Sequence, residues 1–350
     1  MTEVRDSSCQ SKAAANKLKL PKLPAPMNYQ RSLCTACPQA TLKQGALRVL
    51  SIATQNATAA PATMEWPGWL PLLCMPAAAV FVRDRMPAWL FMWNLSFTIF
   101  AALKWMTWWT ARDRSTAGVG RSIAYLMAWP GMDAEAFLDR SRRPSHPQFL
   151  EWCWASAKTA LGILLLWVVA RRIPAEQALL RGWIGLFGLI FLLHFGSFHL
   201  LALFWQTMGI DVQPIMLKPI LSRTLSEFWG RRWNLGFRQL AHEFIFRPLH
   251  KRIGVAAAGM AVFAASGLIH DLVISVPARG GYGLPTAYFL LQGLGVTLER
   301  SHFGGKIGLQ EGLRARFFTI VVTAAPAFWL FHPLFVKCVI LPFLQAIGAL

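Results

Sequence analysis

Two polar segments stand out in a strongly apolar chain because their residue types could carry out chemistry. His270 lies deep in an apolar segment, is followed directly by Asp271, and has Ser266 one helical turn before it. An ionisable side chain costs about 2.5–3.5 kcal/mol near the middle of a bilayer, so one that is found there is by default a candidate functional group. An imidazole could transfer a proton. The alternative is a hydrogen-bonded structural histidine, and these residues alone do not decide between the two.

The second polar segment, Ser226–Asn234, lies in a connection that is too polar to span a membrane and is unusually rich in tryptophan. If this segment is helical, three polar side chains share one face at positions i, i+4 and i+7, namely Glu227, Arg231 and Asn234. Two indole rings, those of Trp229 and Trp233, form a second face. The pattern predicts an interfacial amphipathic helix with an ion pair between Glu227 and Arg231 and with tryptophan anchors.

A second interpretation of the same segment is a binding platform at the membrane surface. The adjacent guanidinium groups of Arg231 and Arg232 would bind an anionic headgroup, because guanidinium pairs well with phosphate. Asn234 would add a polar contact. Charge alone does not choose between this interpretation and the first.

The elements that must position these residues are expected to be membrane-spanning helices. The chain is 55% hydrophobic and only 15% charged, whereas a soluble domain has about 25% charged residues. A spanning helix needs about 20 mostly apolar residues. Seven segments qualify: Trp66–Val82, Pro87–Trp109, Glu151–Ala170, Trp183–Ile210, Ile253–Val276, Gly283–Leu298 and Phe317–Leu350. The predicted fold is all-α, a polytopic transmembrane helical bundle of about 7–9 spans, because prolines divide the last segment and 118–130 is a further candidate.

The net charge of +19 fits this arrangement better than it fits nucleic-acid binding. If the N-terminus is cytoplasmic, the connections on that side hold 26 Lys and Arg residues and the opposite connections hold 6. Such an imbalance is the positive-inside pattern of membrane proteins. No basic run is combined with a nucleic-acid-reading motif. We therefore expect a multi-pass integral membrane protein with a cytoplasmic N-terminus, whose partner is the lipid bilayer and not a nucleic acid.

Residues 1–63 differ in kind from the rest, since they are basic, nearly free of acidic residues, and without an apolar run long enough to span a membrane. Three interpretations are open: a disordered tail, a translation start placed too far upstream of Met64, or an organellar transit peptide. The remaining residues, 64–350, are predicted to form one membrane-embedded domain.

Two lysines and two histidines in other predicted spans also need an interpretation. Lys104 and Lys158 lie close enough to segment ends to extend their ammonium groups toward water. His194 and His199 are five residues apart and diverge by about 140° on a helix, so they do not form one metal-binding edge. We expect both to be hydrogen-bonded histidines within the bundle.

Three motifs taken together resemble the wax synthase-like branch of the membrane-bound O-acyltransferase family. They are EFWGRRWN (Glu227–Asn234), FRPL (Phe246–Leu249) and SGLIHD (Ser266–Asp271). That family pairs an FWGRRWN-type loop with a later SGLxHE helix, and here 36 positions separate Asn234 from His270. The resemblance is specific over Leu217–Gln292. Its one departure is Asp271, where the family usually has glutamate.

This resemblance implies a helical bundle with a reaction chamber inside the membrane, and the transfer of a long-chain fatty acyl group from acyl-CoA to a fatty alcohol, giving a wax ester. A diacylglycerol or a sterol is the alternative acceptor. The motif asparagine and histidine map onto Asn234 and His270, which would be catalytic. The substrate-binding residues implied by the two motifs are Glu227, Trp229, Arg231, Arg232, Trp233, Ser266 and Asp271. No cofactor or metal is expected beyond acyl-CoA as the co-substrate.

Under the same resemblance, His270 would take the proton of the alcohol hydroxyl as it attacks the thioester, and would return it to the CoA thiolate. Asn234 would donate a hydrogen bond to the oxyanion or to the CoA carbonyl. Arg231 and Arg232 would meet the CoA phosphates. A transporter that uses its membrane histidines as pathway residues is the alternative class, but it predicts inverted repeats, and the sequence has no internal repeat between its halves.

Overall fold

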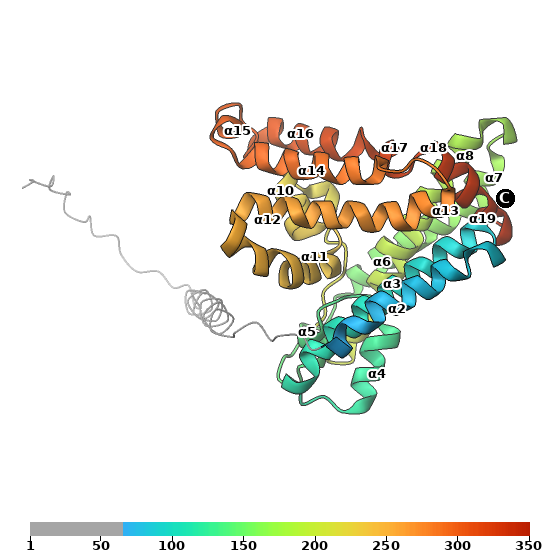
Figure 1. Cartoon of the computed structure of the whole chain (residues 1–350). Helices are drawn as coiled ribbons and strands as arrows, with labels where there is room; N and C mark the ends of the chain where they lie inside the picture. Colours follow the sequence, from blue (N-terminus) through green and yellow to red (C-terminus); the bar gives the residue numbers. More distant parts are fainter. Residues whose placement is uncertain (1–65) are drawn as a thin grey trace, which may run out of the picture. The chain divides into compact units, whose positions relative to one another are not determined.

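The structure of the protein is a computed structural model that describes residues 66–350. The predicted leader, 1–63, lies outside the described residues. Every regular element between Trp66 and Leu350 is helical, with no strand among the described residues, and the prediction of an all-α fold is confirmed. Figure 1 shows the helices as long rods joined mostly by short turns.

The α-helices are α2 (Trp66–Phe81), α3 (Ala88–Ala111), α4 (Val119–Ala128), α5 (Ala134–Leu138), α6 (Phe149–Leu164), α7 (Ala170–Arg172), α8 (Ala178–Leu189), α9 (Phe198–Thr207), α10 (Leu225–Glu227), α11 (Leu235–Ala241), α12 (Arg247–His270), α13 (Val276–Ala278), α14 (Leu284–Arg300), α15 (His302–Lys306), α16 (Gly312–Ala324), α17 (Ala327–Leu330), α18 (Pro333–Phe335) and α19 (Leu341–Ala346). Short 3-10 turns occupy Arg83–Arg85, Arg112–Arg114, Ala175–Gln177 and Pro219–Leu221.

Segments of π-helix, in which the backbone hydrogen bond runs from residue i+5 to residue i, interrupt several of these helices. They are η3 (Leu165–Val169), η5 (Ile190–Ser197), η7 (Phe228–Arg232), η8 (His242–Phe246), η9 (Asp271–Ser275) and η10 (Val336–Ile340). Two of them, η7 and η9, lie in the two motifs that the sequence singles out. They change which side chains share a face there.

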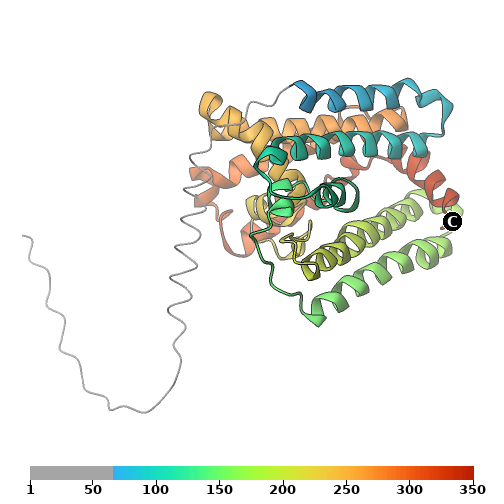
Figure 2. The ribbon, with the colours of Figure 1, turned by 90° about the horizontal axis from the view of Figure 1, so that it is seen from below.

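Four continuous helical stretches are long and apolar enough to cross a membrane by length and composition: Phe149–Arg172, Ala175–Thr207, Leu235–Ala278 and Gly312–Leu330. Two shorter apolar helices, Trp66–Phe81 and Pro333–Ala346, accompany them. Within the described residues, α2 packs along α3, α12 packs along α14, and α6 packs along η5 (Figures 1 and 2).

The longest of these stretches, Leu235–Ala278, is not one straight helix. Gly254 has φ +83° and ψ 165° inside it, a conformation that glycine adopts readily and that other residues rarely do. The chain therefore breaks after Ile253, and the part of α12 that carries His270 begins at Val255. This agrees with the predicted start of the fifth span at Ile253.

Small residues let α12 and α14 approach each other closely beside His270. A Cβ atom added to Gly267 would lie 2.7 Å from the Cα atom of Thr286, which is closer than real Cβ contacts. Gly293 on α14 is similarly close to Met260 and Phe263. Small residues on this face therefore permit the close approach of the two helices.

The prediction that Lys104 extends toward water is wrong. Its side chain is buried, donates to the carbonyl oxygen of Gly131, and places its ammonium group 3.2 Å from the ring centroid of Tyr125. The Tyr125 hydroxyl in turn lies 2.7 Å from the Thr107 hydroxyl. An acceptor carbonyl and an aromatic face together satisfy the buried cation, and they hold the segment that follows α4 against α3.

Candidate active site

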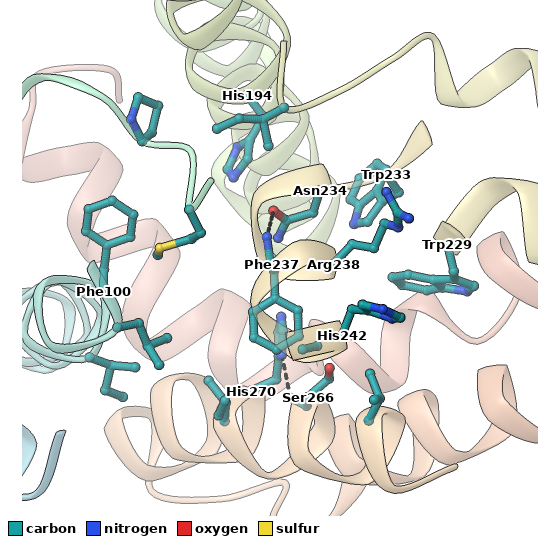
Figure 3. Close-up of a pocket in the computed structure, with 18 of the residues that line it drawn as sticks. Phe100, His194, Trp229, Trp233, Asn234, Phe237, Arg238, His242, Ser266 and His270 are labelled. Atoms are coloured by element: carbon teal, nitrogen blue, oxygen red, sulfur yellow. Dashed lines mark hydrogen bonds between the residues drawn. The ribbon is translucent and has the colours of Figure 1, made fainter. Parts of the chain in front are cut away.

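A cavity of about 820 Å³ lies among α3, α4, α9, α11, α12 and α14. Most of the side chains that line it are aromatic or aliphatic, and the few polar ones include Asn234, Ser266 and His270 (Figure 3). The two motifs that resemble the acyltransferase family therefore contribute to one apolar space. A largely apolar pocket with a few convergent polar groups is the usual form of a small-molecule site.

His270 is the last residue of α12 and is held by its own helix. Its Nδ1 atom lies 2.7 Å from the carbonyl oxygen of Ser266, and its ring lies against Phe289 with the centroids 4.4 Å apart. Because a carbonyl only accepts, the bond assigns the proton to Nδ1 and leaves Nε2 with its lone pair. Among the described residues, no hydrogen-bond partner contacts Nε2, so this nitrogen can accept a proton. Ser266 acts here through its backbone.

Asn234 occupies a left-handed backbone conformation, with φ 42° and ψ 62°, at the N-terminus of α11. Asparagine tolerates this conformation better than most residues. Its Oδ1 atom accepts from the backbone N–H of Phe237 at 3.3 Å and caps the helix (Figure 3). In the part of the chain that the structure describes, the Nδ2 group has no hydrogen-bond partner. It remains a free donor in the cavity lining.

The segment that precedes Asn234 is π-helical, and this overturns the expected ion pair between Glu227 and Arg231. Glu227 instead pairs with Arg232, whose Nη2 atom lies 2.6 Å from Oε1. The π-turn moves the neighbouring side chain from i+4 to i+5, as the backbone bond from Trp233 to Phe228 also shows at 2.9 Å. The Arg223 backbone N–H and the Arg232 guanidinium hold the pKa of Glu227 below its ordinary value.

Trp229 and Trp233 both line the cavity. The ring of Trp233 stacks on Phe228 with centroids 5.3 Å apart and planes at 17°. The indole Nε1–H of Trp229 donates to the side-chain oxygen of Gln292 at 3.2 Å. The predicted second face of two indoles therefore forms one wall of the cavity.

Two of the predicted substrate-binding residues, Glu227 and Arg231, line a second and polar cavity of about 540 Å³. Its lining comprises Arg223, Thr224, Ser226, Glu227, Arg231, Arg300, Gln310, Glu311 and Gly312. Ser226 and Arg300 line both cavities. The polar cavity is thus adjacent to the apolar one.

Arg232 and Asp271 do not line either cavity. The guanidinium of Arg232 is used by Glu227 and by the carbonyl oxygens of Leu217 and Lys218, at 3.3 and 3.4 Å. The guanidinium of Arg232 therefore binds groups of the protein itself, whereas the sequence predicted that Arg232 contacts the substrate together with Arg231.

Asp271 points away from His270, because consecutive residues of a helix do not face each other. Its carboxylate accepts from the Ser275 hydroxyl at 2.8 Å, from the backbone N–H of Gly283 at 2.9 Å and from that of Thr286 at 3.0 Å. The Thr286 hydroxyl adds a fourth bond. Asp271 thus joins the end of α12 to the start of α14 and does not line the cavity. Its role as a substrate-binding residue stays a prediction.

Sequence reasoning missed two buried polar residues near the cavity, Gln292 and Glu299, and did not name Arg238 and His242, which line it. Gln292 and Glu299 are buried on α14 and contact the segment around Trp229. His194 lines the cavity, and its Nδ1 atom is buried without a partner among the described residues, so the expectation of a hydrogen-bonded histidine fails at that atom. The sequence signal that could have identified Gln292 and Glu299 was their seven-residue spacing on an apolar helix.

The other membrane histidine, His199, is hydrogen-bonded as expected. Its Nδ1 atom lies 2.8 Å from the ammonium group of Lys158. In the described part of the chain, no group of three or more His, Cys, Asp or Glu side chains lies close enough together to hold a metal ion.

The four apolar helices of membrane-spanning length and the apolar cavity indicate the class of protein: an all-helical integral membrane protein. Residues 212–291, which contain both Asn234 and His270, match the sequence profile of the membrane bound O-acyl transferase family. The resemblance inferred from the three motifs is confirmed over this central part of the chain.

Known relatives agree with the family match. The long-chain-alcohol O-fatty-acyltransferase of Simmondsia chinensis is 28% identical over 144 residues, which are 37% of this chain and 40% of that protein. Acyl-CoA–sterol O-acyltransferase 1 of Arabidopsis thaliana is 26% identical over 140 residues, with the same shares of 37% and 40%. A probable long-chain-alcohol O-fatty-acyltransferase 2 of Arabidopsis thaliana is 33% identical over 107 residues, 28% of this chain and 31% of that protein. The chain therefore spans less than half the length of these relatives.

Proposed function

We propose that this protein is a membrane-bound O-acyltransferase that transfers a long-chain fatty acyl group from acyl-CoA to the hydroxyl of a fatty alcohol, forming a wax ester. The observation that carries the proposal is that Asn234 and His270 line the same apolar cavity. The names of the relatives support both the acyl transfer and the choice of a lipid alcohol as acceptor.

In the proposed reaction His270 is the general base. Its unprotonated Nε2 accepts the hydroxyl proton as the alcohol oxygen attacks the thioester carbonyl carbon. A tetrahedral intermediate forms, the carbon–sulfur bond breaks, and the imidazolium returns the proton to the CoA thiolate. The bond from Nδ1–H to the Ser266 carbonyl supports this role because it fixes both the tautomer and the direction of the ring.

Asn234 is proposed to stabilise the oxyanion of that intermediate. Its Oδ1 atom is committed to the cap of α11, and this bond orients the free Nδ2 group. Hydrogen-bond donors that are held in place before the reaction, such as this one, contribute about 2.7–4 kcal/mol in comparable sites. The apolar lining would hold the hydrocarbon chains and exclude water, which otherwise competes as the acceptor.

The polar cavity is the proposed position of the CoA moiety. It offers the guanidinium groups of Arg223, Arg231 and Arg300, and it adjoins the apolar cavity through Ser226 and Arg300. Of the two adjacent arginines, Arg231 is proposed as the phosphate contact, since the guanidinium of Arg232 is already occupied. The residues come from the connections 211–252 and 299–316, both of which the charge pattern assigns to the cytoplasmic side. We propose the same orientation, with a cytoplasmic N-terminus and 7–9 spans.

The test is an assay on membranes that contain the expressed full chain. Labelled palmitoyl-CoA is supplied with a fatty alcohol, a diacylglycerol or a sterol, and the lipid products are separated. Labelled wax ester, absent when His270→Ala is expressed at the same level, supports the proposal. Sterol ester or triacylglycerol would instead assign one of the other acceptors, and no labelled ester with any acceptor would refute the acyltransferase function.

A further inference from the structure

Helix α14 carries two buried polar side chains about two turns apart. Gln292 is 0% exposed and Glu299 is 3% exposed. Residues seven apart lie on the same face of a helix. Both side chains contact the segment from Thr224 to Asn234, hereafter the loop, although α10 and η7 lie within it. Burying polar groups is costly unless they are hydrogen-bonded, so their bonds identify what this face does.

Glu299 holds the beginning of the loop. Its carboxylate accepts from the backbone N–H of Leu225 at 2.6 Å and from that of Ser226 at 3.2 Å. These are the first two amides of α10, which have no partner within the helix. The third amide, that of Glu227, donates to the Thr224 hydroxyl at 3.1 Å. All three free amides at this helix start are thereby satisfied, two of them by a residue 74 and 73 positions away.

Gln292 holds the middle of the loop. Its Oε1 atom accepts from the indole N–H of Trp229 at 3.2 Å, and its Nε2 atom donates to the carbonyl oxygen of Val322 on α16 at 2.8 Å. The two bonds together fix the orientation of the amide. The indole of a cavity-lining residue is therefore tied to two helices that do not belong to its own segment.

The far end of the loop is held by the backbone. The N–H of Leu235 donates to the carbonyl of Ile215 at 3.0 Å, and the N–H of Leu217 donates to the carbonyl of Arg232 at 2.8 Å. Asn234 therefore lies between fixed points on both sides. Its left-handed conformation would relax if either side were released.

We propose that Gln292 and Glu299 are positioning residues that hold the loop from Thr224 to Asn234 in the geometry the reaction needs. This inference rests on the proposed function. Neither residue is proposed to touch the reacting atoms; each acts through the loop. A catalytic group displaced by about 1 Å can cost on the order of 10²-fold in rate, so releasing the loop lowers kcat. Because Ser226 and Arg231 of the same loop line the polar cavity, KM for acyl-CoA is expected to rise as well.

The first experiment compares Glu299→Ala, Glu299→Gln and Tyr288→Phe in purified full-length protein. Tyr288 is also on α14 and donates to the Thr323 carbonyl at 3.1 Å, but none of its described bonds reaches the loop. We expect Glu299→Ala to lower kcat on the order of 10²-fold and to raise KM for palmitoyl-CoA. Glu299→Gln keeps one acceptor and is expected to be intermediate. Tyr288→Phe is the matched loss of a buried bond and is expected to keep kcat.

The second experiment is a double-mutant cycle between Gln292→Leu and Trp229→Phe. If Gln292 acts through the indole of Trp229, the kcat of the double variant equals that of Trp229→Phe alone. Additive losses would overturn that part of the proposal, because residues that act through one bond are not additive. This cycle also carries the test if Glu299→Ala does not fold.

Hydrogen exchange separates failure of this inference from failure of the proposed function. Loss of the Glu299 carboxylate is expected to speed exchange at the amides of Leu225 and Ser226, whether or not the protein transfers acyl groups. Unchanged exchange in a folded Glu299 variant, or a wild-type kcat per folded molecule, overturns the positioning role. A wild-type protein that is inactive with every acceptor refutes the function and leaves the exchange result to decide the role of the helix.

Discussion

The Nδ1 atom of His270 lies 2.7 Å from the carbonyl oxygen of Ser266, one helical turn earlier on α12. Because a carbonyl oxygen can only accept, the neutral imidazole carries its proton on Nδ1. The bond therefore fixes the tautomer without a hydrogen bond to a carboxylate. A carboxylate usually supplies this second contact, and Asp271, although adjacent in sequence, points to α14 instead.

Replacing His270 with alanine is expected to abolish measurable ester formation without unfolding the protein. General acid–base groups contribute on the order of 10²–10⁴-fold in rate, which exceeds the sensitivity of most membrane assays for a slow enzyme. The matched control is His250→Ala. His250 is on the same helix, its Nδ1 atom lies 2.9 Å from the Arg247 carbonyl, and it does not line the cavity. Equal loss of activity in both variants would contradict a catalytic role for His270.

Replacing Asn234 with aspartate separates its two tasks. Aspartate keeps an oxygen to cap α11 and tolerates the left-handed conformation, but it lacks the Nδ2 donor. We expect the thermal midpoint of Asn234→Asp to stay near that of the wild type while kcat falls on the order of 10²–10³-fold. Asn234→Gly favours the backbone conformation but loses both the cap and the donor. A glycine variant with much higher kcat than the aspartate variant would show that the donor is not required.

The sequence could locate the two motifs because their chemistry is unusual in an apolar chain. A histidine within an apolar segment is costly, and a Trp- and Arg-rich connection cannot span a membrane. The apolar composition also placed the start of the fifth span at Ile253, next to the break at Gly254. These signals are local, and local signals can be read from residue types alone.

Side-chain partners were harder to predict because π-helical turns change the register by one residue. A regular α-helix of 3.6 residues per turn would pair Glu227 with Arg231. The π-helical turn pairs Glu227 with Arg232 instead. The burial of Lys104 also depends on a carbonyl 27 positions away, and the caps supplied by Glu299 come from 73 and 74 positions away. Contacts of this kind depend on how helices pack, so the partner of each side chain cannot be read from helical spacing alone.

Replacing Asp271 with alanine is expected to destabilise the protein more than it affects the chemistry directly. The backbone N–H groups of Gly283, which is exposed, and of Thr286, which is half-buried, would lose their acceptor. A fully buried group left without a partner costs about 1–3 kcal/mol, so the loss of stability from Gly283 is expected to be smaller than that. The thermal midpoint of purified protein measures this loss. Thr286→Val, which removes only the hydroxyl bond, is expected to give a smaller decrease. An Asp271→Ala protein as stable as the wild type would show that the joint between α12 and α14 is unimportant.

Substitution of Arg231 and of Arg232 should affect different properties of the protein, substrate affinity and stability respectively, although the two arginines are adjacent in the sequence. Arg231→Ala is expected to raise KM for palmitoyl-CoA and to leave the thermal midpoint unchanged, since among the described residues its guanidinium has no partner. Palmitoyl-pantetheine, which lacks the nucleotide phosphates, should show no such increase in KM. If both acyl donors are affected equally, Arg231 does not contact the phosphates.

Arg232→Ala is expected to lower the thermal midpoint, because it leaves Glu227 without its guanidinium partner. The pKa of Glu227 is depressed in the folded protein, so the pair stabilises the fold above the pKa of the unfolded glutamate. That contribution is lost as the pH falls through the lower, folded value. The difference in midpoint between wild type and Arg232→Ala should therefore be present at neutral pH and shrink on acidification. A difference that stays constant, or grows, as the pH falls would show that Arg232 stabilises the fold through the Leu217 and Lys218 carbonyls and not through Glu227.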